Sequence, residues 1–527
     1  MTGQEGDVDN LSLMVGCGFQ RLVGAGRRVA FAALVVGCTQ LLGCAQTIHN
    51  DPVNAQLTGS PQQQAAELGV DARPTLDDTV VAVTFSGGGT RAAAFSFGVL
   101  QGFDETRLEY GGRAMSLLDQ LDFVSGVSGG SVLAAYYGLK KRAAMTDFKQ
   151  RFLLANGEEA LQTDLSFLNL AKGLSGGIND TTGFPRWLDA HLFGGATFKD
   201  MTRGGTPEVW INAADIYNRT AFIFADVTFR ALCSDLANYP LSLAVAASAA
   251  VPVVFAPVVI QNYPGGCPAE LPPWVERVRH DDTAAPLIRA YADALERYRT
   301  GDIKYVKLLD GGIVDNYGLA GFTISLLAAN APYGPLSPRE AVKLRRLLFM
   351  VVDSGRGPSG TWAQTVAGPA GVDLINATSD TAMVSSAIGS YTSFDTTMDQ
   401  WRNNLVNWRC HISDAERGRL GVAPGWNCKD VKFFVGRVSF DQLGPDRSAA
   451  LNAVETRLKL PPDQVEMLIG AGRDALKANK VFREFLNAGP RLRPPPMRPR
   501  GAPVANAMPG SHEAGPQEAH AEELQPQ

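Results

Sequence analysis

The sequence predicts an α/β fold, and three observations support that prediction. Three apolar runs with the character of buried strands each end in a glycine-rich turn, at residues 86–91, 126–130 and 310–312. Runs of helical composition follow the first two turns, so the order strand, turn, helix recurs. The chain has 527 residues, of which 45% are hydrophobic and 19% charged, and it can therefore bury a large core.

Charge and ligand spacing exclude several classes of function. The formal net charge is -5, so the chain lacks the basic footprint of a nucleic-acid-binding protein. No Cys-x-x-Cys or His-x-x-x-His spacing indicates a metal site. We therefore expect no nucleic-acid partner, no metal and no cofactor, while protein partners stay unknown.

The first 43 residues have the pattern of an export signal. Three arginines, at positions 21, 27 and 28, precede a short apolar run over 29–37. The segment Leu41-Leu42-Gly43-Cys44 then resembles a bacterial lipobox, which implies a lipid on Cys44; Cys38 is a second candidate. A start at Met14 would give the signal the usual length. We expect an exported, membrane-anchored bacterial lipoprotein on the periplasmic or outer-membrane face; the alternative is an amphipathic N-terminus that stays in the cytoplasm.

Composition divides the rest of the chain into three parts. Residues 44–76 are rich in Gln, Asn, Asp, Pro and Gly without periodicity, which predicts a polar tether. Residues 77–488 form the expected domain. Residues 489–527 are proline-rich at first and then acidic, which predicts a disordered tail.

Four cysteines lie beyond the signal, an even number in a chain expected in an oxidising space. We expect disulfides between near neighbours, Cys233 with Cys267 and Cys410 with Cys428. Three pairings are allowed by the sequence, and four free thiols are the alternative.

A first buried strand is predicted at Thr79–Phe85 because the run is β-branched and apolar. Ser86-Gly87-Gly88-Gly89-Thr90-Arg91 follows, and a glycine loop before a helix turns several N–H groups towards an anion. A phosphate cradle would need a P-loop Lys-Ser/Thr or a dinucleotide fingerprint, and both are absent. An oxyanion hole needs only N–H groups, to which Arg91 adds positive charge.

The candidate nucleophile is Ser128 in Gly126-Val127-Ser128-Gly129-Gly130. This turn lies between an apolar run and a helix-prone segment, so it would expose the hydroxyl above the positive end of a helix. Of the neighbouring serines, only Ser128 has glycine two residues away on both sides. A Gly-x-Ser-x-Gly pattern alone is weak, because the chain has 55 glycines.

The remaining segments fit the same fold. The apolar run 241–260 is divided by Pro252 and Pro257, which favours a short helix and an extended piece over a membrane span. Residues 268–302 are polar and predict a surface insertion. Further strands are expected at 209–215, 221–224, 305–309, 347–352 and 432–438, and a last helix at 462–486.

Asp310 ends the apolar run 305–309 and is followed by Gly311-Gly312. Open α/β sheets build their sites at the carboxyl ends of strands, which makes Asp310 a candidate site residue. An ordinary Asp-Gly turn is the alternative.

The three turns, in this order, resemble the patatin-like phospholipase family, as does the stretch Ala247-Ser248-Ala249-Ala250-Val251-Pro252. The resemblance covers about 79–352. It implies a three-layer α/β/α sandwich with a mainly parallel sheet, and hydrolysis of membrane-lipid or other acyl esters by a Ser-Asp dyad through an acyl-enzyme. By that resemblance Ser128 is the nucleophile, Asp310 the base, and Gly87, Gly88, Gly89 and Arg91 form the oxyanion hole, within a catalytic domain spanning 77–488. Residue 92 is alanine where many members have glycine.

Two alternatives stay open. In a Ser-His-Asp α/β-hydrolase the chain order would be satisfied by His411, although no histidine follows a strand as a triad histidine would. The other alternative is a non-catalytic lipid-binding surface lipoprotein.

Overall fold

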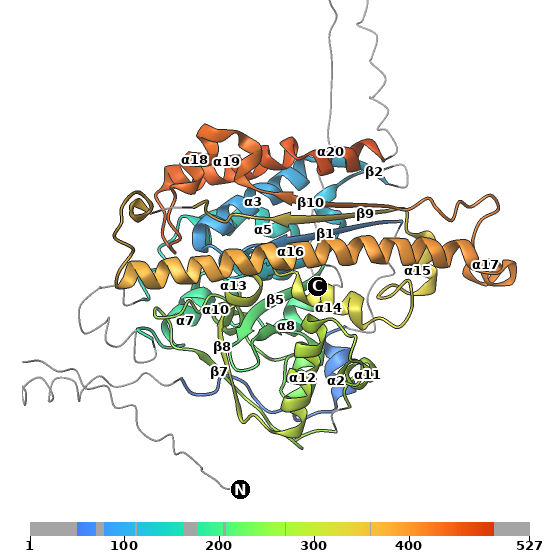
Figure 1. Cartoon of the computed structure of the whole chain (residues 1–527), viewed down its shortest axis with the longest axis horizontal. Helices are drawn as coiled ribbons and strands as arrows, with labels where there is room; N and C mark the ends of the chain where they lie inside the picture. Colours follow the sequence, from blue (N-terminus) through green and yellow to red (C-terminus); the bar gives the residue numbers. More distant parts are fainter. Residues whose placement is uncertain are drawn as a thin grey trace, which may run out of the picture.

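The computed structural model describes residues 50–69, 78–110, 113–161, 177–203, 207–268, 270–358 and 360–489. The expected export signal with Cys38 and Cys44, and the expected tail beyond 489, lie outside the described residues. Figure 1 shows a central sheet with helices on both of its faces.

Within the described residues the central sheet has eight strands in the order β10-β9-β1-β4-β5-β8-β7, with β6 also paired to β5. The strands are β1 (Thr79–Phe85), β4 (Leu121–Val127), β5 (Glu208–Asp215), β6 (Thr220–Ile223), β7 (Val258–Gln261), β8 (Tyr305–Asp310), β9 (Arg346–Val352) and β10 (Lys432–Val438). The five strands from β10 to β5 are parallel, whereas β6, β7 and β8 join antiparallel. A separate hairpin pairs β2 (Arg107–Tyr110) with β3 (Arg113–Ser116). The expected sandwich with a mainly parallel sheet is confirmed.

Helices cover both faces of this sheet (Figure 1). They are α2 (Pro61–Glu67), α3 (Gly89–Glu105), α4 (Gly129–Lys140), α5 (Ala144–Phe148), α7 (Gly183–Leu188), α8 (Phe198–Thr202), α9 (Asp226–Ala231), α10 (Leu241–Ser248), α11 (Pro273–Arg279), α12 (Pro286–Thr300), α13 (Gly312–Asp315), α14 (Ala320–Ala328), α15 (Pro338–Lys343), α16 (Val372–His411), α17 (Asp414–Leu420), α18 (Pro445–Asn452), α19 (Pro462–Ala478) and α20 (Lys480–Asn487). Among the described residues, no helix is both long and apolar enough to cross a membrane.

Strand β1 shows how the sheet creates two cores. All seven of its residues are buried, and successive side chains point to opposite faces. Val81 and Val83 pack in the core that contains α3, α4 and α19. Val80 and Ala82 pack in the second core, with α14 and α16. A strand covered on both faces reads as a continuous apolar run, which is why the sequence identified it.

Helices α3 and α19 approach so closely that glycine is required at their contact. A Cβ atom on Gly472 would lie 2.1 Å from the carbonyl oxygen of Phe95, and one on Gly98 would lie 2.1 Å from that of Ile469. Gly470, two residues from Gly472 in the same helix, has nothing within 4 Å of its Cβ position. The two glycines of α19 therefore have opposite roles.

We predict that Gly472→Ala destabilises the protein by about 1–3 kcal/mol, because the helices must separate to admit the methyl group. Gly470→Ala is the matched control and should stabilise by up to about 1 kcal/mol through helix propensity. Thermal or urea unfolding of both variants measures the difference. Equal effects of the two substitutions would contradict the close packing.

The expected tether is wrong for residues 50–69, which pack against the domain. The N–H of Val53 donates to the carbonyl of Val259 (3.1 Å), and the amide of Asn54 both donates to and accepts from the backbone of Gln261. This segment therefore covers the open edge of β7, the end strand of the sheet. Leu57 is buried nearby, at 7% exposure. The polar composition concealed this packing because amide side chains make much of the contact.

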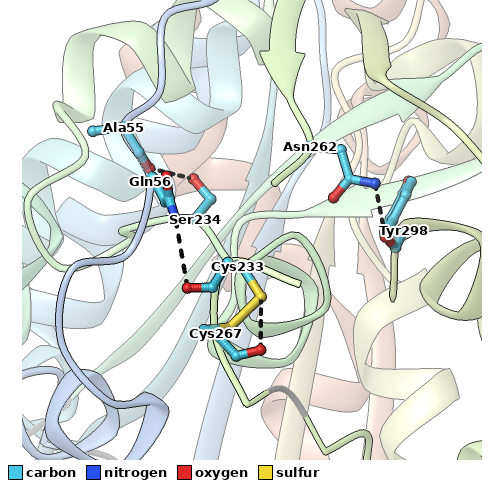
Figure 2. The surroundings of a disulfide bond; sticks show 8 residues. Ala55, Gln56, Cys233, Ser234, Asn262, Cys267 and Tyr298 are labelled. Carbon is cyan, nitrogen blue, oxygen red and sulfur yellow. Dashed lines mark hydrogen bonds between the residues drawn. A yellow bond between two sulfur atoms is a disulfide. The ribbon is translucent and has the colours of Figure 1, made fainter. Parts of the chain in front are cut away.

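The two expected disulfides are present, Cys233–Cys267 and Cys410–Cys428, with Cα–Cα distances of 5.5 and 5.0 Å. Figure 2 shows the first bridge beside the N-terminal segment, where the hydroxyl of Ser234 donates to the carbonyl of Ala55. The N–H of Leu57 also donates to the carbonyl of Cys233 (2.8 Å). The bridge therefore lies at the point where the segment joins the domain.

Three segments differ from the sequence-based expectation. Residues 268–302 are not a simple surface insertion, because α12 buries Ile288, Tyr291, Leu295 and Tyr298. The expected last helix is two helices, α19 and α20, divided at Asn479. The 40-residue helix α16 had no counterpart among the expected elements.

Candidate functional site

Ser128 lies in a strained turn between β4 and α4. It is the N-cap residue of α4, with φ 50° and ψ −122°, in a region that residues other than glycine rarely adopt. Such strain persists only where the surrounding structure enforces it, and it clusters at functional sites. The turn places the side chain at the N-terminus of α4, whose dipole favours negative charge there.

The Ser128 turn and the glycine loop after β1 are in direct contact. A Cβ atom on Gly129 would lie 2.0 Å from the carbonyl oxygen of Gly89. Only glycine at position 129 allows this approach. As a result, the N-terminal ends of α3 and α4 meet next to Ser128.

Asp310 ends β8, and its carboxyl group lies close enough to the Ser128 hydroxyl for that hydroxyl to lower its pKa. It is 2% exposed, and this burial raises the pKa of its carboxyl group to about 6. The N–H of Gly312 donates to its Oδ1 (2.8 Å), and this bond and the nearby Ser128 hydroxyl oppose the rise in pKa. The carboxylate is thus a stronger base than an exposed aspartate, yet it is ionised at neutral pH.

Ser248 supports both members of the pair. Its hydroxyl donates to the carbonyl of Asn212 (2.6 Å) and accepts from the N–H of Ser128 (2.8 Å). The carbonyl of Ser248 accepts from Gly311, and that of Ala250 accepts from the N–H of Asp310. The stretch 247–252 therefore holds the serine turn and the aspartate turn in one framework.

The amides of Gly88 and Gly89 remain available to a ligand. Neither has a hydrogen-bond acceptor among the described residues. By contrast, the N–H of Gly87 donates to the carbonyl and to the Oδ1 of Asn316, both at 3.2 Å. This corrects the expectation that Gly87 contributes an oxyanion-hole N–H, because that group is already engaged.

Arg91 also has a different place from the one expected. It is 3% exposed, and its guanidinium donates to the carbonyl of Val454 (2.9 Å). Burial lowers its pKa to about 10, so it is still charged at neutral pH. Arg91 thus links the start of α3 to the segment after α18. It could stabilise an oxyanion at Ser128 only through its positive charge and not through a hydrogen bond.

Each described histidine forms a ring hydrogen bond to a backbone carbonyl, and none bonds to Ser128 or Asp310. His411 ends α16, and its ring bonds to the carbonyl of Asn407. The part of α16 that contacts the site region is Ser386, whose hydroxyl donates to the carbonyl of Val314 on α13. Those 25 residues of helix span about 37 Å. The alternative triad with His411 is therefore wrong. His191 and His280 bond to carbonyls four residues before them, those of Trp187 and Glu276.

Residues 83–323 match the family model described as patatin-like phospholipase. No curated protein sequence matches the chain. Among solved structures, the human GIVD cytosolic phospholipase A2 is similar, with 12% identity over 55% of this chain and a TM-score of 0.23. The chain spans about half of that protein, 48%, and a likeness at this TM-score carries no argument.

The α/β sandwich thus places a buried carboxyl group beside a serine in a strained turn. Over residues 83–323 the chain is similar to the patatin-like phospholipase family, whose general activity is lipid acyl hydrolysis. The strands β9 and β10 and the helix α16 complete the fold beyond the matched residues.

The sequence did not identify Asn316 as a site residue. It directly follows α13, six residues after Asp310, and its Oδ1 accepts from the N–H of Gly87, 229 residues earlier in the chain. The closeness of Asn316 to Asp310 in the sequence could have marked it as a candidate site residue. No local pattern, however, predicts its contact with Gly87 in the glycine loop. The geometry makes Asn316 a positioning residue for the loop that carries the free amides.

We predict that Asn316→Ala lowers kcat by roughly 10- to 100-fold with little change in KM, because the released loop no longer holds the Gly88 and Gly89 amides in place. Asn54→Ala is the matched control: it removes an amide that also binds backbone, far from the dyad, and should lower Tm without changing kcat. Steady-state kinetics on a chromogenic ester measures both variants. Full kcat in Asn316→Ala would show that the loop needs no such tether.

Proposed function

We propose that this chain is a lipid acyl hydrolase of the phospholipase A type, which cleaves carboxylic esters through an acyl-enzyme on Ser128. The observation that carries the proposal is the placement of Ser128, in its strained turn, beside the buried carboxyl group of Asp310. The acyl-ester substrate is a membrane lipid or a related ester.

In the first half of the reaction the Oγ of Ser128 attacks the ester carbonyl carbon, and its proton passes to the carboxylate of Asp310. The carbonyl electron pair moves to the oxygen, where the amides of Gly88 and Gly89 and the N-termini of α3 and α4 stabilise the negative charge. Collapse of this intermediate expels the alcohol, which takes the proton from Asp310. The acyl group is then bound to Ser128.

In the second half, water attacks the acyl-enzyme. Asp310 accepts a proton from the water, and the same two amides stabilise the second oxyanion. Release of the fatty acid returns the proton to Ser128. One carboxyl group thus serves both halves, which requires that it be ionised at the start of each.

We predict that Ser128→Ala and Asp310→Asn each reduce turnover to near background and that the double variant is hardly worse, because residues acting in one step have non-additive effects. A fluorophosphonate probe should label Ser128 in the parent and lose most of that labelling in Asp310→Asn. Ser96→Ala is the matched control, since this serine is buried on α3 and its hydroxyl has no hydrogen-bond partner in the described structure. Substantial activity in Asp310→Asn would remove the aspartate from the mechanism.

The pH dependence separates loss of the base from loss of the fold. Activity of the parent should fall as the pH drops below about 6, because Asp310 becomes protonated. Because the pKa of Asp310 is higher in the folded than in the unfolded protein, the free energy of unfolding of the parent falls as the pH rises from about 4 to 6. It stays at the lower value above pH 6. Asp310→Asn lacks this loss and should be up to about 3 kcal/mol more stable at pH 7.5. An Asp310→Asn variant that is less stable than the parent at pH 7.5 would contradict the predicted cost of burying the Asp310 carboxylate. Its loss of activity could then be due to unfolding.

We also propose that the protein is exported and anchored to a membrane through a lipid on Cys44. The disulfides Cys233–Cys267 and Cys410–Cys428 support export, since such bridges persist in oxidising compartments.

If Cys44 is the lipid attachment site, Cys44→Ser should leave the protein unprocessed or release it from the membrane fraction, because the thioether-linked lipid requires sulfur. Mass spectrometry of the mature N-terminus and membrane fractionation measure this. Cys38→Ser is the control and should change neither. A lipid-modified N-terminus at residue 38 would shift the anchor to the second candidate.

A further inference from the structure

An irregular segment between α18 and α19 lies against the loop that carries the free amides. We call these residues, 453–458, the supporting segment; they lie outside residues 83–323, which match the family model. The N–H of Thr90 donates to the carbonyl of Arg457 (2.8 Å). A Cβ atom on Gly89 would lie 2.6 Å from the same carbonyl oxygen, so the supporting segment and the glycine loop are in direct contact.

The supporting segment determines which amides at the start of α3 stay free. A helix leaves its first N–H groups without partners inside the helix. Of these groups, the N–H of Thr90 is engaged by the carbonyl of Arg457, whereas those of Gly88 and Gly89 have no acceptor among the described residues. The carbonyl of Arg457 therefore fixes the helix start on which the two free amides are set.

The carboxylate of Glu158 holds the supporting segment in place. Its two oxygens accept from the guanidinium of Arg457, with an Nε–Oε1 distance of 3.0 Å and an Nη2–Oε2 distance of 2.7 Å. Oε1 also accepts from the N–H of Leu458 (3.2 Å), and the N–H of Gly157 donates to the carbonyl of Leu458 (3.1 Å). A doubly bonded arginine–carboxylate pair combines strength with a fixed geometry. Glu158 thus fixes both a side chain and the main chain of the supporting segment.

The Glu158 carboxylate stays charged wherever the proposed base is active. Its side chain is 15% exposed, whereas that of Arg457 is 52% exposed. The bonds from the Arg457 guanidinium lower the pKa of Glu158, against the opposing effect of burial. Burial raises the pKa of Asp310 to about 6, so Glu158 is already ionised at the pH at which Asp310 titrates.

We infer that Glu158 is a positioning residue for the oxyanion hole. It holds the carbonyl of Arg457 in place, and that carbonyl in turn sets the free amides of Gly88 and Gly89. The inference rests on the proposed function, because it assigns a further residue to the same reaction. An exposed ion pair contributes little to stability, whereas a shift of about 1 Å in the reacting geometry can lower turnover by as much as about 100-fold. Loss of the Glu158 contact should therefore affect turnover more than stability.

Steady-state kinetics of Glu158→Gln on a soluble chromogenic ester tests this role. The variant should lower kcat about tenfold and leave KM unchanged, and the acidic limb of its pH profile should keep the midpoint of the parent. Glu105→Gln is the matched control, because this carboxylate also forms a 2.7 Å ion pair, with Lys477, but at the opposite end of α3, about 24 Å along the helix. Glu105→Gln should keep full kcat. Full kcat in Glu158→Gln, or a displaced midpoint, would overturn the inference.

Coupling between the two side chains separates positioning from a general loss of packing. Arg457→Gln should lower kcat as much as Glu158→Gln, and the double variant should be hardly worse, because both substitutions remove the same contact. Arg457→Lys keeps the charge but not the paired geometry, so its kcat should lie between those of the parent and Arg457→Gln. Additive losses in the double variant would overturn the inference.

Amide hydrogen exchange tests the contact without relying on activity. In the inactive Ser128→Ala background, Glu158→Gln should speed exchange of the Thr90 amide at least about fivefold, because its bond to Arg457 opens more often. Glu105→Gln should leave that exchange unchanged. Unchanged exchange in Glu158→Gln would overturn the inference whatever the kinetics show. Absence of esterase activity in the parent would instead refute the proposed function, while the exchange experiment would still decide whether Glu158 holds the loop.

Discussion

The burial of the Asp310 carboxyl group beside Ser128 is the constraint on which the site depends. Burial makes the group a useful base and also makes its ionisation costly. The register of the sheet brings Ser128 and Asp310 together. Val127, the residue before Ser128, pairs with Asn212, and Asp310 pairs with Ala213, so both site residues lie at the same level on either side of β5. A shift of β8 by one residue would turn the carboxylate to the opposite face. The antiparallel pairing of β8 with β5 is therefore as important for the position of Asp310 as the parallel strands are for that of Ser128.

The supporting contacts come from segments that are far apart in the chain. Ser248 connects the serine turn to β5, and Asn316 connects the aspartate turn to the glycine loop. Each support is a side chain that bonds backbone, so it fixes where a main-chain group lies. A site of this kind is precise because its parts are held by rigid elements and by short polar contacts between them.

The sequence predicted the parts of this structure that depend on local patterns. The bounds of β1 and β10 were predicted correctly, because long β-branched or aromatic runs bounded by turns have few other solutions. Ser128 and Asp310 were selected as candidates because glycines mark the turns around them, and they stay a prediction. Asn316 and the packing of residues 50–69 were missed, since both depend on hydrogen bonds between distant segments. Helix α16 was missed because its first half is rich in Gly, Ser and Thr and has no clear apolar period.

If Cys44 carries the proposed lipid, the N-terminal segment that covers β7 limits how far the domain can lie from the membrane. Asn50 is already fixed, since its amide donates to the carbonyls of Ala256 and Pro257. Only six peptide units separate it from Cys44, and they span at most about 20 Å. A lipid on Cys44 would thus keep Asn50, and with it the domain, within about 20 Å of the bilayer surface. The search for substrate then becomes mainly a matter of lateral diffusion and tilt.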